Sequence, residues 1–476
     1  MECAPSAAGD VQAARHLLSA DEERTLRITP SVLYNKLQVV HTMYDRIAIF
    51  TIALFLALGL SACDLLDVEN PNSLQEERLS TPTSADAMVG GIQATVTRGV
   101  SYIYAPYSTG TDELIWVGSR DAWLDLSRGF IGSSLNEFSD LAFTFVAEAE
   151  WTAREFIGRL EGFQEAGTLP DERLLAEAYL YGAIIKTTVG DVFSNWAFSD
   201  KEEPGEPIGE ANMVQLYDQA LEYVNNGLAL NTDLEAELSA MRARILFSRS
   251  AWAKVHPAGD VNTADPLVNN PDAAAAAQEA LDLMDSDDFI YELPVAPDGG
   301  FNSYVAFQVN ERNELLPDTT VYIAPSDDEN SADAVILEDP IDEVTHPYLE
   351  TVIDTKYRGD LDDFVSLTVV SAREMHLIIA ENALANGDTG PGSTFRTQIN
   401  ALRALDGLSD YTGQIPAQEI LEASRQASLY LQRRRLTDMY RFGVSSPQWQ
   451  PSSDAVRTPG TFIPLTNTEI RANPNL

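Results

Sequence analysis

The stretch 171-DERLLAEAYLYGAIIKTTVGDVF-193 decides how the fold of this chain is interpreted. Its apolar residues recur at steps of three and four, at Leu174, Ala178, Tyr181, Ile185, Val189 and Val192. This spacing is typical of one stripe of an amphipathic helix. Three small residues, Ala176, Gly182 and Ala183, lie among them, and small side chains on a contact face allow two helices to approach closely. The stretch therefore predicts a helix that packs tightly against its neighbours.

Similar helical patterns recur on both sides of this stretch. The expected helices lie at 81–99, 213–230, 236–255, 269–284, 371–388, 393–405 and 417–443. Asn270 and Pro271 form a typical helix start, and Gly387 a typical stop. Helices of this length, rich in small residues and roughly 30–40 residues apart, resemble tetratricopeptide-type hairpins. The expected fold is therefore mainly α, with a helical scaffold at about 80–99, 171–285 and 371–443.

Two regions lack a sustained period and are expected to be loop-rich, at about 100–150 and 286–370. The first is rich in aromatic residues, and the second in Pro, Gly, Asn and acid clusters. Long non-periodic insertions between helical blocks more often carry function than serve as filler. We therefore expect these two regions to form a loop-rich ligand-binding face on the helical scaffold.

An apolar run at 47–60 ends just before Cys63. The run is too short to span a bilayer but has the length of a signal-peptide core. The sequence 60-LSAC-63 resembles the bacterial lipobox, which implies that 43–62 is a lipoprotein signal peptide and that Cys63 carries the lipid. The alternative is a buried core helix. Because residues 1–42 fit no part of a signal peptide, we expect them to be an over-extended start, with Met43 as the true one.

Charge excludes several classes of partner. The chain has 31 Lys and Arg against 73 Asp and Glu, a formal net charge of −42. Such a surface repels nucleic acid and anionic membrane surfaces. Acid excess with few lysines is typical of a halophile, because salt screens self-repulsion; a merely acidic exported protein is the alternative. With Cys63 lipidated and Cys3 before Met43, no disulfide is expected, so the fold must depend on its core.

The order of these segments resembles the SusD/RagB family of surface glycan-binding lipoproteins. The resemblance rests on 63-CDLLDVENP-71, 176-AEAYLYGAIIKTTVGDVF-193, 371-SAREMHLIIAENALANGD-388, 399-INALRALDGL-408 and 433-RRRLTDMYRFG-443. These stretches follow one another in family order, although Asn382 stands where the family usually has alanine. The resemblance implies that 63–476 is a single SusD-like domain of four tetratricopeptide-like pairs.

The resemblance also implies a function and a partner. The chain would be a lipid-anchored outer-membrane protein facing the cell exterior, which captures an oligosaccharide or other nutrient oligomer. It would deliver that ligand to a TonB-dependent SusC-like β-barrel. No motif fixes the ligand, which in this family ranges from oligosaccharides to peptides. A peptide-binding importer component and a tetratricopeptide-type interaction scaffold remain alternatives.

A pyranose presents an apolar C–H face and a ring of hydroxyls, so its binder needs an aromatic platform with planar polar groups at the edge. The stretches 102–123 and 301–314 offer both. The candidate ligand-binding residues are Tyr107, Trp116, Arg120, Asp121, Trp123, Phe301, Asn302 and Tyr304. The alternative for the aromatic residues is a place in the core.

Arg433, Arg434 and Arg435 are consecutive, and on the expected helix they would point in three directions. At least one is expected to pair with a scaffold carboxylate such as Glu374 or Glu381. Anion binding is the alternative for this run.

No enzyme motif is present: the sequence has no nucleophile-elbow Gly-x-Ser-x-Gly, no His-Glu-x-x-His and no phosphate-binding loop. Carboxylate pairs occur at every spacing in so acidic a chain and carry no signal. The acidic stretches 326–330 and 359–364 lack the spacing of an EF-hand loop, so a solvated surface is expected there and no metal or cofactor. The sequence favours a non-catalytic capture protein, with a surface glycoside hydrolase as the less favoured alternative.

Overall fold

The computed structural model describes residues 79–476 apart from 200–202, 327–332 and 360. The expected signal peptide at 43–62, the lipid-attachment residue Cys63 and the segment 1–42 lie outside the described residues. Parts of the two acidic stretches do so as well. In the described ranges, no helix combines the length and the apolar character needed to cross a membrane.

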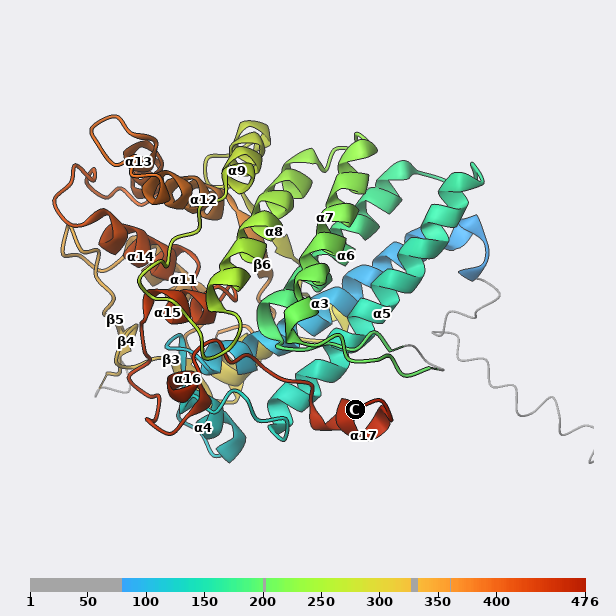
Figure 1. Ribbon diagram of the computed structural model, residues 1–476, viewed down its shortest axis with the longest axis horizontal. Coiled ribbons are helices and arrows are strands. Elements are labelled where there is room, and N and C mark those ends of the chain that lie inside the picture. The colour runs from blue at the N-terminus through green and yellow to red at the C-terminus, as the bar shows by residue number, and fades with distance from the viewer. Residues whose placement is uncertain (1–78, 200–202, 327–332, 360) are drawn as a thin grey trace, which may run out of the picture. The chain divides into compact units, whose positions relative to one another are not determined.

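The long helices pack in pairs that follow one another along the chain (Figure 1). The pairs are α3 (Ala85–Thr109) with α5 (Glu137–Glu165), α6 (Glu172–Val192) with α7 (Val214–Ala229), α8 (Glu235–Val255) with α9 (Pro271–Leu283), and α12 (Ala372–Ala385) with α13 (Thr394–Leu405). Each pair contacts the next, through α6 on α3 and α5, α8 on α7, and α12 on α9. The mainly helical, tetratricopeptide-like fold predicted from the sequence is confirmed.

The stretch 171–193 forms α6, as predicted, but its burial is not confined to one stripe. Asp171 caps the helix by accepting a hydrogen bond from the backbone N–H of Arg173, and every residue from 178 to 193 is buried. A Cβ atom at Gly182 would lie 2.6 Å from Cδ1 of Ile157. The lack of a side chain at Gly182 therefore fits the close packing of α6 against α5. The single-stripe interpretation was wrong because α6 is enclosed by other helices.

The expectation of loops over 100–150 was wrong. Helix α3 continues to Thr109, α4 spans Asp121–Ser127 and α5 begins at Glu137. The second half of α3 has no polar face because nearly all of its residues are buried, so it lacks the amphipathic period on which the prediction relied. Helix α5 does carry that period, in the buried residues Phe138, Ala142, Val146, Ala149, Ala153, Ile157 and Leu160.

The region 286–370 is built mainly from short elements, as expected. The strands form three antiparallel pairs in the described part of the chain: β1 (Leu114–Trp116) with β3 (Leu315–Pro317), β2 (Ile290–Leu293) with β6 (Leu367–Ser371), and β4 (Ile323–Ala324) with β5 (Ala334–Val335). The helical elements here are η4 (Pro297–Gly299), α10 (Tyr304–Ala306), η5 (Phe307–Glu311) and α11 (Pro347–Lys356). Strand β6 leads directly into α12, whose cap Ser371 accepts a hydrogen bond from the N–H of Glu374.

The expected single helix over 417–443 is broken. Helix α14 spans Ala417–Ser428, α15 spans Arg435–Phe442, and Leu431 and Arg433 between them have φ of 56° and 61°. The backbone N–H of Leu431 donates to the Glu113 carboxylate at 2.7 Å. A long-range contact therefore replaces the local helical hydrogen bonds. Two short helices, α16 (Asp454–Arg457) and α17 (Asn467–Ala472), complete the chain.

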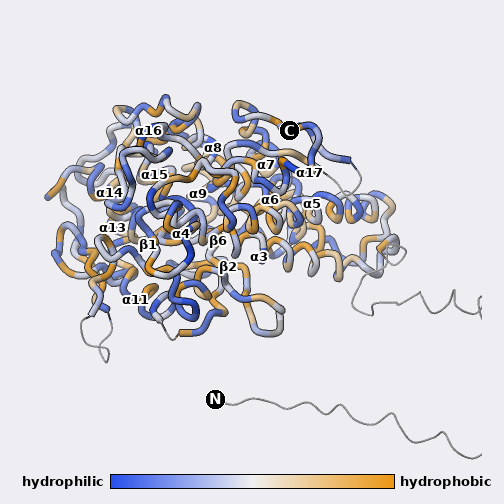
Figure 2. The backbone as a smooth tube through the Cα atoms, turned by 90° about the horizontal axis from the view of Figure 1, so that it is seen from below, coloured by the Kyte–Doolittle hydropathy of each residue, from blue (hydrophilic) through white to orange (hydrophobic). Residues whose placement is uncertain are grey.

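In the described residues, the core consists of two buried apolar clusters. The larger one joins α3 to α9 and includes side chains of β6 and α15, and the smaller one lies among α12, α13 and α14. Figure 2 shows hydrophobic and hydrophilic residues interspersed along these helices, as expected for elements that are packed on one side and solvated on another.

Candidate ligand-binding groove

Aromatic side chains from four helices form one continuous row, the aromatic row. Tyr102 of α3 stacks on Tyr304 of α10, with ring centroids 4.3 Å apart, and contacts Phe145 of α5 at the same distance. On the far side, Trp123 of α4 lies 6.3 Å from Tyr304 and stacks on Phe138 of α5 at 3.6 Å. The order along the row is Phe145, Tyr102, Tyr304, Trp123 and Phe138.

An arginine covers each end of the aromatic row. The Arg98 guanidinium lies 3.8 Å from the Phe145 centroid, and that of Arg120 lies 4.6 Å from the Phe138 centroid. Each arginine also pairs with a glutamate of α5: Arg98 with Glu148 at 3.9 Å and Arg120 with Glu137 at 2.9 Å. Cation–π attraction orients both side chains, and these exposed ion pairs add little stability.

Several candidate residues lie where a ligand cannot stack on them. Tyr107, Trp123 and Tyr304 are 2%, 0% and 7% exposed, so their rings belong to the core. Burial also raises the pKa of Tyr304 to about 12, which keeps its hydroxyl protonated. The prediction that Tyr107, Trp123 and Tyr304 form the ligand platform is therefore wrong, because their rings are buried. The structure favours the alternative that the sequence left open for them.

The remaining candidates from 102–123 lie at the surface but do not line the large groove described below. Trp116 is half-buried and packs against the core from β1. Arg120 and Asp121 are exposed at the start of α4, where Arg120 is held by Phe138 and Glu137. Of these residues, Arg120 lies at the Phe138 end of the aromatic row, whereas Tyr102, nearer the other end, lines the groove.

A groove of about 700 Å³ opens beside α3, and we call it the α3 groove. It is lined by Ala94, Thr95, Arg98, Tyr102, Pro297, Gly299, Gly300, Phe301, Asn302 and Phe364. It contains two of the predicted residues, Phe301 and Asn302. Its volume is within the range of about 300–1,000 Å³ typical of small-molecule sites.

The α3 groove combines aromatic surface with a few polar groups. Tyr102, Phe301 and Phe364 are each half-buried, with one side packed against the core. The Arg98 side chain is 40% exposed and is the only cation among the described lining residues. Asn302 uses one amide N–H on Asp363, which leaves its carbonyl oxygen and a second N–H as hydrogen-bonding groups. Aromatic surface beside planar polar groups is the combination that a sugar ring requires of a binding site.

The loop that carries Phe301 is fixed to two other elements. The Ser101 hydroxyl of α3 donates to the carbonyl of Asn302 at 3.2 Å and accepts from the N–H of Tyr304 at 2.8 Å. The Asn302 amide donates to the Asp363 carboxylate at 2.7 Å, and the N–H of Ser303 donates to the Asp363 carbonyl at 2.8 Å. These bonds hold the groove wall in place before any ligand arrives.

Sequence reasoning missed Thr95, Arg98 and Phe364. Arg98 and Tyr102 are four residues apart on α3 and therefore share a helix face, but the predicted helix ended at residue 99. Phe364 follows an acidic stretch, and nothing in its local pattern distinguishes it. A local signal for Arg98 was therefore present in the sequence. Phe364, in contrast, is brought to the groove by tertiary structure alone.

A second groove, of about 760 Å³, lies between the ends of α7, α8 and α9. Its described lining contains acids, amides, Ser239 and Arg242 but no aromatic ring. It lacks the platform on which a sugar could stack. Among the described residues, no group of three or more His, Cys, Asp or Glu is arranged to hold a metal ion.

Neither a protein-family model nor a protein of described function matches the chain in sequence. Solved structures do match in fold. A SusD homolog from Bacteroides thetaiotaomicron is 12% identical, with 85% of this chain and 98% of that chain covered and a TM-score of 0.59. NanU of Bacteroides fragilis is 12% identical, with 86% of this chain and 98% of that chain covered and a TM-score of 0.58. A SusD-like carbohydrate binding protein from Bacteroides vulgatus is 10% identical, with 77% of this chain and 84% of that chain covered and a TM-score of 0.53.

Proposed function

We propose that this chain, which has the fold of the SusD superfamily, captures oligosaccharides at the cell surface and passes them to a SusC-like TonB-dependent outer-membrane transporter. The observation that carries the proposal is the α3 groove, in which half-exposed rings lie beside a guanidinium and an amide. One structure of similar fold is described as a carbohydrate binding protein, which supports this ligand class.

Binding would use the groove as follows. The rings of Phe301 and Phe364 pack against the apolar C–H faces of the sugar, while Arg98 and Asn302 bind hydroxyls at its edge. Because Arg98 is the only lining cation in the described part of the groove and already pairs with Glu148, there is no unpaired positive charge to attract an anionic sugar. The net charge of −42 repels such ligands further. We therefore favour neutral oligosaccharides.

We propose binding without catalysis. Most glycoside hydrolases need two carboxyl groups that flank the scissile bond. None of the described residues that line the α3 groove is Asp or Glu. Capture followed by release to a transporter also requires only moderate affinity, which stacking and a few hydrogen bonds supply.

The membrane part of the proposal rests on 60-LSAC-63, which resembles a lipobox. The lipid on Cys63 would anchor the chain in the outer membrane, with the α3 groove facing the cell exterior. A multiply acylated cysteine holds a protein at a membrane far better than one myristoyl chain does. The transporter as partner is inferred from the resemblance to the SusD/RagB family.

A glycan and peptide array tests the proposal. The purified protein is applied at low and at molar salt, and bound ligands are examined for cleavage products. Retention of neutral glycans without product supports capture. Binding of peptides alone would replace the proposal with a peptide importer or an interaction scaffold, and released sugar would replace it with a hydrolase.

A further inference from the structure

Six arginines of α8 and the 425–441 segment lie buried in the described part of the fold. Each is less than 10% exposed. Five form ion pairs with five buried carboxylates: Arg244 with Asp191 at 3.0 Å, Arg425 with Asp438 at 2.8 Å, Arg434 with Glu374 at 2.6 Å, Arg435 with Asp112 at 2.6 Å, and Arg441 with Glu381. The predicted pairing of the 433–435 run with a scaffold carboxylate is thus confirmed for Arg434 and Glu374.

Arg433 is the sixth, and it has no such partner. Its side chain is 1% exposed, and none of its three guanidinium nitrogens has a hydrogen-bond or ion-pair partner among the described residues. Its one clear contact is with the Tyr104 ring, whose centroid lies 4.3 Å from the guanidinium carbon. Burial lowers the pKa of Arg433 to about 10, so the group still carries its charge at neutral pH.

The nearby sixth carboxyl group does not supply the missing charge. Glu113 is 1% exposed and accepts the N–H of Leu431 at 2.7 Å, but its Oε2 atom has no hydrogen-bond partner among the described residues. No ion pair between Glu113 and a described arginine is present. Burial raises the pKa of Glu113 to about 7. Among these six arginines and six carboxyl groups, the ion pairs leave Arg433 without a carboxylate partner.

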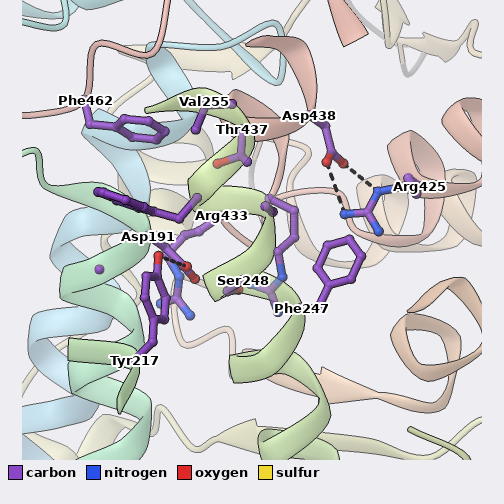
Figure 3. Close-up of a pocket in the computed structure, with 14 residues that line it drawn as sticks. Asp191, Tyr217, Phe247, Ser248, Val255, Arg425, Arg433, Thr437, Asp438 and Phe462 are labelled. Atoms are coloured by element: carbon purple, nitrogen blue, oxygen red, sulfur yellow. Dashed lines mark hydrogen bonds and ion pairs between the residues drawn. The ribbon is translucent and has the colours of Figure 1, made fainter. Parts of the chain in front are cut away.

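A small cavity of about 20 Å³ adjoins Arg433 (Figure 3). Arg425, Arg434, Asp191 and Asp438 also line it, and so does the hydroxyl-bearing Thr437. Figure 3 shows dashed links from Asp438 to Arg425 and from Asp191 to Tyr217, and none to Arg433. Both lining carboxylates are thus already engaged, and the volume suits one water molecule or one small ion.

We propose that this cavity binds one small monovalent anion, chloride in ordinary buffers, against the Arg433 guanidinium. A buried charge without a counter-charge is strongly destabilising. A water molecule would satisfy hydrogen bonds but would leave the extra positive charge uncompensated. An anion accepts hydrogen bonds and also compensates the positive charge, and the guanidinium offers it up to five N–H donors.

The first test compares thermal unfolding in sodium chloride and in sodium gluconate at equal sodium concentration, because gluconate is too large for the cavity. Since a ligand of the folded state stabilises it by mass action, the midpoint should rise by about 1–2 °C per tenfold increase in chloride above the dissociation constant. Arg433→Gln should abolish the difference between the two salts. Arg249→Gln, which removes an exposed arginine paired with Asp218, should retain it.

Crystals of the unmodified protein grown with sodium bromide provide the second test, which does not depend on the folding of a variant. An anomalous bromide peak within hydrogen-bonding distance of the Arg433 guanidinium is expected. The same midpoint in chloride and gluconate, or a water without anomalous signal at that position, would overturn the proposal.

Discussion

Tyr102 and Tyr304 stack with ring centroids 4.3 Å apart and ring planes inclined by 16°, although the two residues belong to separate parts of the chain. The stack fixes α10 on α3. Since Phe301 and Asn302 directly precede α10, it also fixes the loop that forms one wall of the α3 groove. A buried aromatic contact therefore positions the wall of the α3 groove, and the ring of Tyr304 has a structural role.

Arg98→Ala should weaken oligosaccharide binding about three- to tenfold, because it removes the lining guanidinium. Arg242→Ala is the matched control. Arg98 and Arg242 are 40% and 41% exposed, each lies near a glutamate at about 4 Å, and each lines one of the two large grooves. Isothermal titration should show a loss of affinity in the first variant only. An equal loss in both would assign the effect to overall charge.

Trp123→Ala should destabilise the protein by about 3–5 kcal/mol, as expected when a large ring is removed from a core. The ring is fully buried and stacks on Phe138. Trp116→Ala should cost markedly less, because Trp116 is half-buried. Urea unfolding measures both. Similar losses would show that Trp123 does not have the core role assigned to it.

Gly182→Ala should destabilise the fold by about 1–3 kcal/mol, since the added Cβ would lie 2.6 Å from Ile157 Cδ1 on α5. Gly158→Ala on α5 should instead stabilise the protein by about 0.5–1 kcal/mol, because that position is exposed and has open space around it. The two variants make the same chemical change. The unfolding midpoint is measured for both variants. Shifts of that midpoint in the same direction would contradict the close packing of α6.

Glu113 should make stability fall as the pH rises from about 4.5 to about 7. Burial holds its pKa near 7 in the folded state, against an ordinary value of 4.5. Between these values the folded state binds more protons than the unfolded chain, so unfolding becomes more favourable with rising pH. Glu113→Gln should remove this pH dependence. The free energy of unfolding of this variant, relative to that of the unmodified protein, should be about 3 kcal/mol higher at pH 8 than at pH 4.

Histidines act in the opposite direction over part of this range. Burial lowers the pKa of His256, His346 and His376. The folded protein therefore loses stability as the pH falls through about 6.5, where these side chains become protonated in the unfolded chain. The Glu113 contribution is therefore measured as the difference in unfolding free energy between the unmodified protein and Glu113→Gln at each pH. A difference that stays constant from pH 5 to pH 8 would show that Glu113 titrates normally.

Local sequence patterns predicted most of the helices but not where two of them end. The starts of α6 and α9 follow from Asp171 and from Asn270 with Pro271, whose caps are local. The predicted end of α3 at residue 99 was too early because nearly all of the second half of this helix is buried, which weakens its amphipathic period. The break between α14 and α15 depends on Glu113, which lies far away in the sequence, and no local signal at 429–434 reports that contact.

The site was predicted in part for the same reason. Phe301 and Asn302 line the α3 groove because they belong to a loop on the scaffold, and their role in ligand binding stays a prediction. Trp123 and Tyr304 look the same in sequence but are buried by partners from other elements. An aromatic residue in a non-periodic stretch is equally compatible with a platform and with a core, and only tertiary contacts decide between them.

The most direct measurement is isothermal titration of an array-selected neutral oligosaccharide into the unmodified protein and the Phe301→Ala and Phe163→Ala variants, followed by chromatography for cleavage products. Phe163 is a partly buried ring of α5 outside the groove. We expect about tenfold weaker binding for Phe301→Ala, unchanged binding for Phe163→Ala and no product. Equal affinity in all three proteins, or release of shorter sugars, would contradict this expectation.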